Sequence, residues 1–546
     1  MDTISRYVRA GIAATCLSLV FAGCAEIADP LTSAPAPAAP LLATTNGPVQ
    51  GTIEGENGRV AVFRGVRYGA STEGRRFQRA VAPQPWTRMR DATDFGNDCP
   101  QPPMGDVPVF ASWANDQADS EDCLFLNIWT PGLSDGGKRP IMVWLHGGGY
   151  TTGSGSSHAY DGSRLAMRGD VVVVTVNHRL NAFGYTHLGE ITDDPKYADA
   201  GNLGSLDAIL ALQWVRDNAA AIGGDANNVT IFGESGGAAK VSSLMAMPAA
   251  DGLFHRAIAQ SGSMSLNGFP IDMADGLARS LMETAGVSSV KELAELPMDA
   301  LVRAMIASRS RGGLYRPVVD GRSLPRDPFD PDAPAISADV PLLVGTNNNE
   351  LRLQGGLGDP AAFSLTWEQL TPRIARLVGA DRAQELIAGM RAAHPDYDAA
   401  DVYFQTITFG TYRSTALAQA ERKSAAGGAP VYMYRLDWES PVMGGRLGAA
   451  HALDIAFVFD NVARSASYTG PETAETQVLA NLMADAWIAF ARTGNPNTPA
   501  LPMWTPYSER DRGTMVFDVE TEFVQDPDSM ERVLLQRLLP AGRPLR

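Results

Sequence analysis

The chain has 546 residues and is short of several features that define other protein classes. It contains no CxxC pair and no HExxH motif, and its seven histidines are scattered, so the sequence gives little support for a metal site. No period of 20–50 residues repeats, which argues against a solenoid or a propeller. Lysine and arginine (45) are fewer than aspartate and glutamate (61), and a net charge of −16 would repel the phosphates of a nucleic acid.

The chain also lacks an N-terminal apolar run long enough to stay in a membrane. The run at 10–21 follows Arg6 and Arg9 and has the length of a signal-peptide core. Residues 21–24, Phe-Ala-Gly-Cys, resemble a bacterial lipobox, in which the cysteine is acylated and becomes the new N-terminus. We therefore expect a signal peptide over 1–23, a lipidated Cys24 and an exported protein, periplasmic or held at the outer membrane. Ordinary cleavage nearby, with a secreted product, is the alternative.

The segment that follows is rich in proline, alanine, serine and threonine, and such a composition buries too little apolar surface to fold. We expect a tether over 24–48 and a single folded domain over 49–546. Cysteine is scarce, with four in the chain. Cys16 would leave with the signal peptide and Cys24 would be lipidated or free. Cys99 and Cys123 are then the pair available to form a disulfide in an oxidising compartment.

What the chain does have is an ordinary globular composition, 45% hydrophobic and 19% charged, with β-rich runs that alternate with helical patterns. Runs such as 140–145 and 170–176 are almost wholly apolar, as expected of strands buried on both faces of a parallel sheet. The apolar spacing of 206–215 predicts a crossover helix. Further strands are expected at 228–232, 256–260, 341–345, 430–435 and 514–518. The alternation predicts an α/β fold with one doubly wound, mostly parallel sheet and helices on both faces. Residues 360–425 are expected to be mainly helical, either as a cap over the site or as surface helices.

Ser235 lies in a G-x-S-x-G frame, Gly233-Glu234-Ser235-Gly236-Gly237, directly after the strand expected at 228–232. This pattern is the signature of the nucleophile in an α/β-hydrolase fold, where the serine occupies a sharp turn between a strand and a helix. Glycines on either side leave no side chains to collide across that turn. A serine nucleophile also needs a base, an acid that orients the base, and donors for the oxyanion.

The run His146-Gly147-Gly148-Gly149-Tyr150 follows the buried strand at 140–145. Glycines there would let backbone N–H groups approach a tetrahedral oxygen closely. We expect an oxyanion hole formed by Gly148, Gly149 and Gly236, and a contact of Tyr150 with substrate.

Together, these segments resemble the type-B carboxylesterases, the family that includes the cholinesterases and many bacterial esterases. The resemblance covers about 50–520. It also rests on residues 121–131, which are similar to a family signature carrying a disulfide cysteine, and on Gly223-Gly224-Asp225, Gln260-Ser261-Gly262 and 487–497.

The family places its acid just after a strand, and residues 342–350 match that segment, with Leu351 where glycine is usual. The resemblance therefore identifies Glu350 as the acid. Residues 448–459 resemble the family's histidine segment and identify His451 as the base, with Asp454 replacing the usual glutamate. The residues alone would leave three other bases open, which spacing does not rank: His178, His187 and His255.

The resemblance also implies supporting roles. Glu234 and Ser261 match positions beside the catalytic residues, and a carboxylate at Glu234 would stabilise the imidazolium of His451. Trp113 precedes Cys123 by the spacing of a cholinesterase tryptophan that binds quaternary ammonium groups, so it either lines the site or packs in the core.

The expected function is that of a serine carboxylesterase that acts through an acyl-enzyme on a small or medium ester, without a cofactor or a metal. Two alternatives remain open: hydrolysis of a related bond (carbamate, amide or lactone), and a non-catalytic binding homologue.

Overall fold

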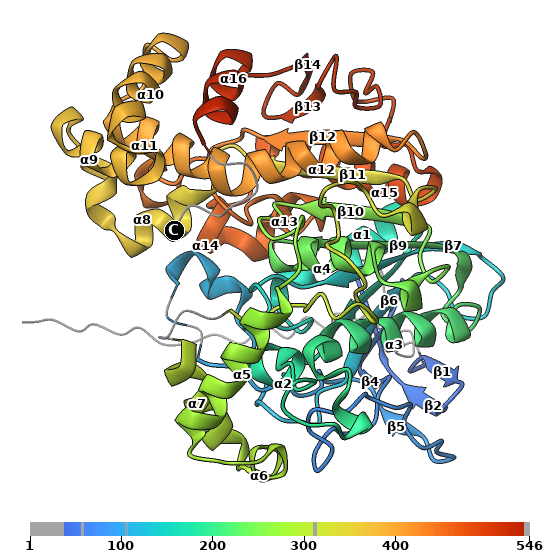
Figure 1. Cartoon of the computed structure of the whole chain (residues 1–546). Helices are drawn as coiled ribbons and strands as arrows, with labels where there is room; N and C mark the ends of the chain where they lie inside the picture. The colour runs from blue at the N-terminus through green and yellow to red at the C-terminus, as the bar shows by residue number, and fades with distance from the viewer. Residues whose placement is uncertain (1–37, 56–58, 104, 106, 310–313, 540–546) are drawn as a thin grey trace, which may run out of the picture. The chain divides into compact units, whose positions relative to one another are not determined.

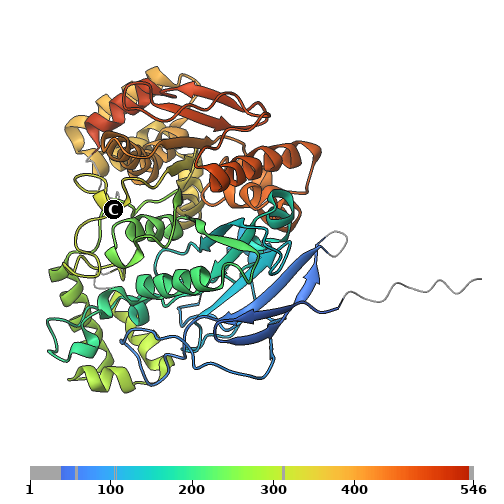
Figure 2. The ribbon, with the colours of Figure 1, turned by 90° about the vertical axis from the view of Figure 1, so that its right-hand side faces the viewer.

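The computed structural model describes residues 38–55, 59–103, 105, 107–309 and 314–539. The described residues from Ala39 onward form one compact unit. Its centre is an 11-stranded sheet in the order β14-β13-β12-β11-β10-β9-β7-β8-β6-β4-β3, with helices on both faces (Figures 1 and 2). The strands are β3 (Thr52–Glu54), β4 (Val60–Arg67), β6 (Phe125–Thr130), β7 (Arg139–Leu145), β8 (Val172–Val176), β9 (Gly224–Glu234), β10 (Arg256–Gln260), β11 (Leu342–Asn347), β12 (Val431–Leu436), β13 (Gly513–Phe517) and β14 (Glu522–Gln525).

The middle of the sheet is parallel and its two edges are antiparallel. All neighbouring pairs from β13 across to β8 are parallel, whereas β14 at one edge, and β6, β4 and β3 at the other, pair antiparallel. The carboxyl ends of the parallel strands therefore meet at one edge of the sheet, the place where open α/β sheets bind their ligands. The strands expected from the sequence between 140 and 518 are all confirmed.

Side-chain alternation along β7 explains why helices cover both faces. Ile141, Val143 and Leu145 belong to the core that contains residues of α3, α4 and α12. Met142 and Trp144 point the other way, into the core that contains residues of α1 and α15. Because successive strand residues face opposite sides, an uninterrupted apolar run fits a strand covered on both faces.

The helices are mostly crossovers between strands or insertions after them. Insertions follow β10 (α5 to α7) and β11 (α8 to α12), and Figure 1 shows these two groups at different places around the sheet. The helices are α1 (Ser163–Gly169), α2 (Asn181–Tyr185), α3 (Leu203–Asn218), α4 (Gly236–Met245), α5 (Ile271–Ala285), α6 (Val290–Glu295), α7 (Met298–Arg309), α8 (Leu351–Gly358), α9 (Trp367–Val378), α10 (Ala380–Ala393), α11 (Ala399–Thr408), α12 (Ser414–Ala425), α13 (Asp454–Val458), α14 (Ala466–Thr469), α15 (Ala474–Thr493) and α16 (Ser529–Leu538).

The expected boundary between tether and domain is wrong. Residues assigned to the tether form an antiparallel hairpin of β1 (Leu41–Thr44) and β2 (Gly47–Gln50), which β5 (Arg90–Asp91) extends into a small sheet. Leu42 and Val49 are buried in the core, so these apolar residues do contribute to folding despite the composition around them. The folded unit therefore begins near Ala39 and not at residue 49.

Candidate active site

Ser235 occupies the turn between β9 and α4, with φ of 57° and ψ of −119°. This conformation is rare for a residue with a side chain, and the surrounding contacts hold it in place. The N–H of Ser235 donates to the carbonyl of Gln260 on the next strand at 2.8 Å. A Cβ atom at Gly233 would lie 2.5 Å from the carbonyl oxygen of Leu145, and one at Gly237 only 1.9 Å from it. Both glycines are required because the end of β7, which runs parallel beside β9, is in direct contact with this turn.

His451 follows the carboxyl end of β12 and Glu350 follows that of β11, and their two side chains are in contact. The Nδ1 of His451 lies 2.6 Å from Oε2 of Glu350, and both side chains are buried. The other carboxylate oxygen of Glu350 accepts a hydrogen bond from the N–H of Asn347 at 2.8 Å. The Tyr468 hydroxyl donates to the carbonyl of His451 at 2.5 Å. The acid therefore holds the ring by Nδ1 and leaves Nε2 available for proton transfer.

A second carboxylate lies against the same ring. Oε1 of Glu234 is 3.2 Å from Nε2 of His451, and among the described residues no side chain forms a hydrogen bond with the hydroxyl of Ser235. Burial disfavours the imidazolium, but the charges of Glu234 and Glu350 outweigh it and raise the pKa of His451 to about 9. Burial likewise raises the pKa of Glu234 well above its usual range, which the nearby His451 partly opposes. Glu234 and His451 thus form a coupled buried pair directly beside Ser235.

The expected oxyanion residues come together at the start of α4. Gly148 and Gly149 have φ of 83° and 64°, and within the described residues no group accepts a hydrogen bond from either N–H. A Cβ atom at Gly236 would lie 2.1 Å from the carbonyl oxygen of Gly149, so the loop and the first residue of the helix are in contact. The first N–H groups of a helix have no partner within it and are free to bind an anion.

These residues open into a cavity of about 810 Å³, which contains Ser235, His451, Glu234 and Gly147 to Gly149 in its lining. Its volume is in the range of small-molecule sites. The lining also includes Val107, Phe110 and Trp113 from the segment between the two cysteines, Gln354 of α8 and Ile455 of α13. The helices α9 to α12 contribute no described residue to the lining, although Tyr412, in a π-helical turn before α12, packs its ring 4.7 Å from that of His451.

Trp113 lines this cavity and Tyr150 does not. Trp113 stacks on Phe110 with ring centroids 5.1 Å apart, and its Nε1 donates to Oγ of Ser465 at 2.9 Å. The ring of Tyr150 packs against Tyr185 in a separate core cluster. Tyr150, the residue after the glycine loop, is buried and is not among the residues that line this cavity, so its contact with substrate stays a prediction.

Gln260, the last residue of β10, anchors Asp454, which follows His451 by three residues in the chain. Gln260 donates from Nε2 to Oδ2 of Asp454 at 2.9 Å and accepts from Nε1 of Trp487 at 3.0 Å. Asp454 also accepts from the hydroxyl of Tyr434 at 2.7 Å, and burial raises its pKa. The Ser261 hydroxyl is buried, and no described residue forms a hydrogen bond with it. Ser261 directly follows β10 with φ of 54°, and its expected position beside the catalytic residues stays a prediction.

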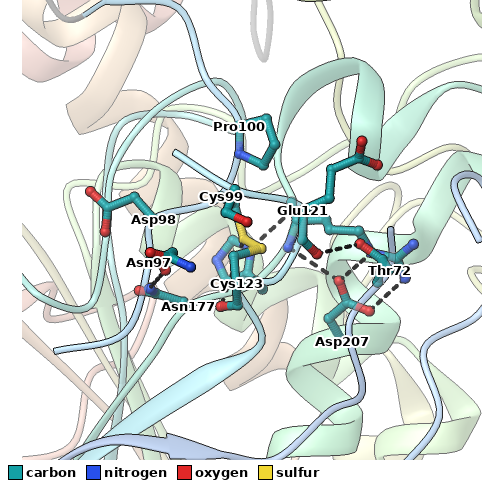
Figure 3. Close-up of a disulfide and its surroundings, with 12 residues drawn as sticks. Thr72, Asn97, Asp98, Cys99, Pro100, Glu121, Cys123, Asn177 and Asp207 are labelled. Atoms are coloured by element: carbon teal, nitrogen blue, oxygen red, sulfur yellow. Dashed lines mark hydrogen bonds and ion pairs between the residues drawn. A yellow bond between two sulfur atoms is a disulfide. The ribbon is translucent and has the colours of Figure 1, made fainter. Parts of the chain in front are cut away.

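Cys99 and Cys123 form a disulfide, as expected from the sequence. Figure 3 shows the disulfide and the side chains around it. Near Cys99, Nδ2 of Asn177 donates a hydrogen bond to the backbone carbonyl of Asn97 at 3.0 Å. The Thr72 hydroxyl donates to the carbonyl of Glu121 at 2.7 Å. The disulfide therefore closes the segment that carries Phe110 and Trp113 and fixes both of its ends.

The three alternative histidines lie elsewhere. His178 stacks on His146 at 4.7 Å, His187 lies 3.7 Å from Asp275, and His255 accepts a hydrogen bond from the N–H of Val229. None of them lines the described cavity. Across the described ranges, no three His, Cys, Asp or Glu side chains are grouped to hold a metal ion, and no helix is long and apolar enough to cross a membrane. The expected signal peptide (1–23), Cys24 and the expected tether up to residue 37 lie outside the described residues.

One buried residue beside the site had not been expected. Lys240 lies in α4, is 2% exposed, and donates from Nζ to the carbonyl of His146 at 2.8 Å. The signal in the sequence is a lone lysine in an otherwise uncharged helix directly after the nucleophile. Without the tertiary structure, that lysine would pass for a solvent-exposed residue.

Comparisons with known proteins agree with this geometry. The family model described as "Carboxylesterase family" matches residues 38–534. The para-nitrobenzyl esterase of Bacillus subtilis is 34% identical over 516 residues, which cover 92% of this chain and 99% of that protein. The phenmedipham hydrolase of Pseudarthrobacter oxydans is 32% identical, covering 91% and 99%. Among solved structures, a carboxylesterase of Geobacillus stearothermophilus is 38% identical with a TM-score of 0.78, covering 91% of this chain and all of that one.

Proposed function

The chain belongs to the carboxylesterase family, and we propose that it hydrolyses esters with a triad of Ser235, His451 and Glu350. Its activity is that of a serine carboxylesterase. The observation that carries the assignment of residues is that a half-buried serine turn, a glycine loop and the histidine of a buried His–Glu pair all line one cavity.

In the acylation step, Nε2 of His451 takes the proton of Ser235 as Oγ attacks the ester carbonyl. Glu350 keeps Nδ1 protonated through its 2.6 Å contact, so Nε2 is the basic nitrogen. The imidazolium then gives its proton to the leaving alcohol, and water attacks the acyl-enzyme by the same route in reverse. A small movement of the ring from Glu234 towards Ser235 would complete the proton path when substrate fills the cavity.

The negative charge that develops on the carbonyl oxygen would be stabilised by the N–H groups of Gly148, Gly149 and Gly236. Preorganised backbone donors of this kind are usually the largest single contribution to catalysis of acyl transfer. Glu234 has a different task in this proposal: its carboxylate favours the imidazolium form of His451, which lies 3.2 Å away.

A direct test compares Ser235→Ala with Ser243→Ala. Ser243 lies on the same helix, its hydroxyl donates to the carbonyl of Ala239, and it does not line the cavity. We expect Ser235→Ala to lose hydrolysis of p-nitrophenyl acetate and labelling by a fluorophosphonate, and Ser243→Ala to keep both. Wild-type turnover in folded Ser235→Ala would refute the proposed nucleophile, and a folded wild type that does not label would instead favour a binding protein.

We propose small and medium esters as substrates. The cavity has a volume of about 810 Å³, and the segment between the two cysteines lines it with the apolar side chains of Val107, Phe110 and Trp113. A relative is named for p-nitrobenzyl esters and another for phenmedipham, so both compounds belong in the first substrate panel. Turnover of phenmedipham with a higher kcat/KM than any ester would favour the alternative of a related bond.

We further propose that the protein is exported and held at a membrane through Cys24. Support comes from the signal-like run at 10–21 and the lipobox-like residues 21–24. Mass spectrometry of the mature N-terminus tests this. An acylated Cys24 is the expected result, and an unmodified N-terminus beyond residue 24 would overturn it.

A further inference from the structure

Lys240 is a buried cation that the proposed catalytic steps do not use. It is 2% exposed and lies in a helix whose other residues are uncharged. Among the described residues its ammonium has one hydrogen-bond partner, the carbonyl oxygen of His146 at 2.8 Å, and no ion pair with a carboxylate. Burying a charge without a counter-charge is costly, and burial lowers the pKa of Lys240 to about 7.

The partner of Lys240 begins the glycine loop. His146 immediately precedes Gly147, Gly148 and Gly149, and its own Nδ1 lies 2.9 Å from the carbonyl of Gly147. Because the peptide unit is planar, fixing the carbonyl of residue 146 also fixes the direction of the N–H of residue 147. Lys240 therefore orients the peptide from which the loop starts.

The other end of the loop is held by the same face of α4. Gly236 and Lys240 are four residues apart, so they lie one turn apart on one side of the helix. Gly236 is in contact with the carbonyl of Gly149, while Lys240 bonds to the carbonyl of His146. One helix face thus contacts both ends of the loop that would supply two oxyanion donors, and the same helix would supply the third.

We infer that Lys240 is a positioning residue for the oxyanion hole: its hydrogen bond to His146 sets the glycine loop at the correct distance from the start of α4. This rests on the proposed function, since it assumes that Gly148, Gly149 and Gly236 bind the oxyanion. Lys240 itself touches neither substrate nor Ser235 in this role. Its loss should weaken binding of the transition state more than binding of the ester.

The experiment uses Lys240→Met, which keeps the length of the side chain and removes the donor. Lys423→Met is the matched control. Lys423 is another buried lysine, in α12, that donates to the backbone carbonyls of Ser337 and Ala338 at 2.7 and 2.6 Å, and it does not line the cavity. Fluorophosphonate labelling of wild-type Ser235 comes first, because a wild type that does not label would refute the proposed function and not this inference. Titration with the same probe then gives the concentration of active enzyme in each variant.

We expect Lys240→Met to lower kcat about 10- to 100-fold with little change in KM, as for a displaced oxyanion donor. A trifluoromethyl ketone, which forms a tetrahedral adduct with serine, should bind more weakly by a similar factor, while Lys423→Met should match the wild type in both measurements. The inference is overturned if kcat of Lys240→Met stays within about 2-fold of wild type, or if kcat falls without weaker ketone binding. An equal loss in Lys423→Met would also overturn it. Should Lys240→Met not fold, Lys240→Gln, whose amide is too short to reach His146, replaces it in the same comparison.

Discussion

Nε2 of His451 lies 3.2 Å from Oε1 of Glu234, the residue that immediately precedes the proposed nucleophile. Glu350 holds the opposite nitrogen of the same ring at 2.6 Å. The base is thus placed between two buried carboxylates, one from the strand that carries the serine and one from two strands away in the sheet. Substitution of either carboxylate should therefore change the pKa of His451.

Replacing Glu234 by glutamine should shift the pH dependence of kcat/KM. His451 acts as a base when neutral, so kcat/KM rises as His451 loses its proton. The carboxylates raise the pKa of His451 to about 9, and removing one of them lowers that pKa. We expect the acid limb to move to lower pH in Glu234→Gln. Asp454→Asn, which removes a carboxylate with a weaker effect on the ring, should move it less in the same direction. If the acid limb of the kcat/KM profile of Glu234→Gln is unchanged, or moves to higher pH, Glu234 does not raise the pKa of His451.

Gly237→Ala should destabilise the protein. The added Cβ atom would lie 1.9 Å from the carbonyl oxygen of Leu145, so β7 or the turn must move. We expect a loss of at least about 1–3 kcal/mol in the free energy of unfolding, together with loss of activity. Gly276→Ala, at an exposed helical site in α5 with no atom within 4 Å of the new Cβ, is the control and should gain about 0.5–1 kcal/mol. Urea unfolding followed by circular dichroism measures both, and equal stabilities in the two variants would refute the steric argument.

Removing the disulfide should affect stability and substrate binding together. The double variant Cys99→Ser/Cys123→Ser opens a segment with a sequence separation of 24, for which the chain-entropy model gives about 3.5 kcal/mol. Since that segment carries Phe110 and Trp113 into the cavity wall, KM should rise more than kcat falls. Thermal unfolding and steady-state kinetics on p-nitrophenyl esters check both parts. A stable variant with unchanged KM would show that hydrogen bonds alone hold the segment.

Trp113→Ala should discriminate between esters by the size of their apolar portion. The indole lines the cavity and stacks on Phe110, so its removal takes away apolar contact area. We expect KM to rise about 10-fold or more for a p-nitrobenzyl ester and much less for a methyl ester. Trp113→Phe keeps an aromatic ring but loses the N–H that donates to Ser465. For the p-nitrobenzyl ester, its KM should lie between that of the wild type and that of Trp113→Ala. Equal changes for both esters would place Trp113 in a purely structural role.

Much of the site could be predicted from the sequence because its parts are local. The serine turn needs only a strand, glycines and a helix, all within 228–245, and the glycine loop directly follows a buried strand. The same locality explains where the neighbours in the chain mislead. Tyr150 follows the glycine loop but is buried outside the cavity lining, and residues 41–48 were assigned to a tether on composition, although Leu42 is buried.

His451 and Glu350 were identified by resemblance, since spacing along the chain did not separate His451 from His178, His187 and His255. The sheet separates them in the structure. Parallel pairing places the ends of β7, β9, β11 and β12 at one edge, and the segments that follow these strands contain the glycine loop, Ser235, Glu350 and His451. The other histidines lie outside the described cavity.

The sequence by itself determined the strand–turn–helix around Ser235, because those backbone angles depend on glycines a few residues away. The resemblance implies Glu234 and Glu350 beside His451, but only the tertiary structure decided how closely these charges approach the ring, with Asp454 near them, and it alone placed Lys240 against His146. These groups are up to 220 residues apart in the chain, as with Glu234 and Asp454. Their contacts follow from strand register and helix face. Burial then dominates the pKa shifts of Glu234 and Lys240, whereas at His451 the neighbouring carboxylates outweigh burial.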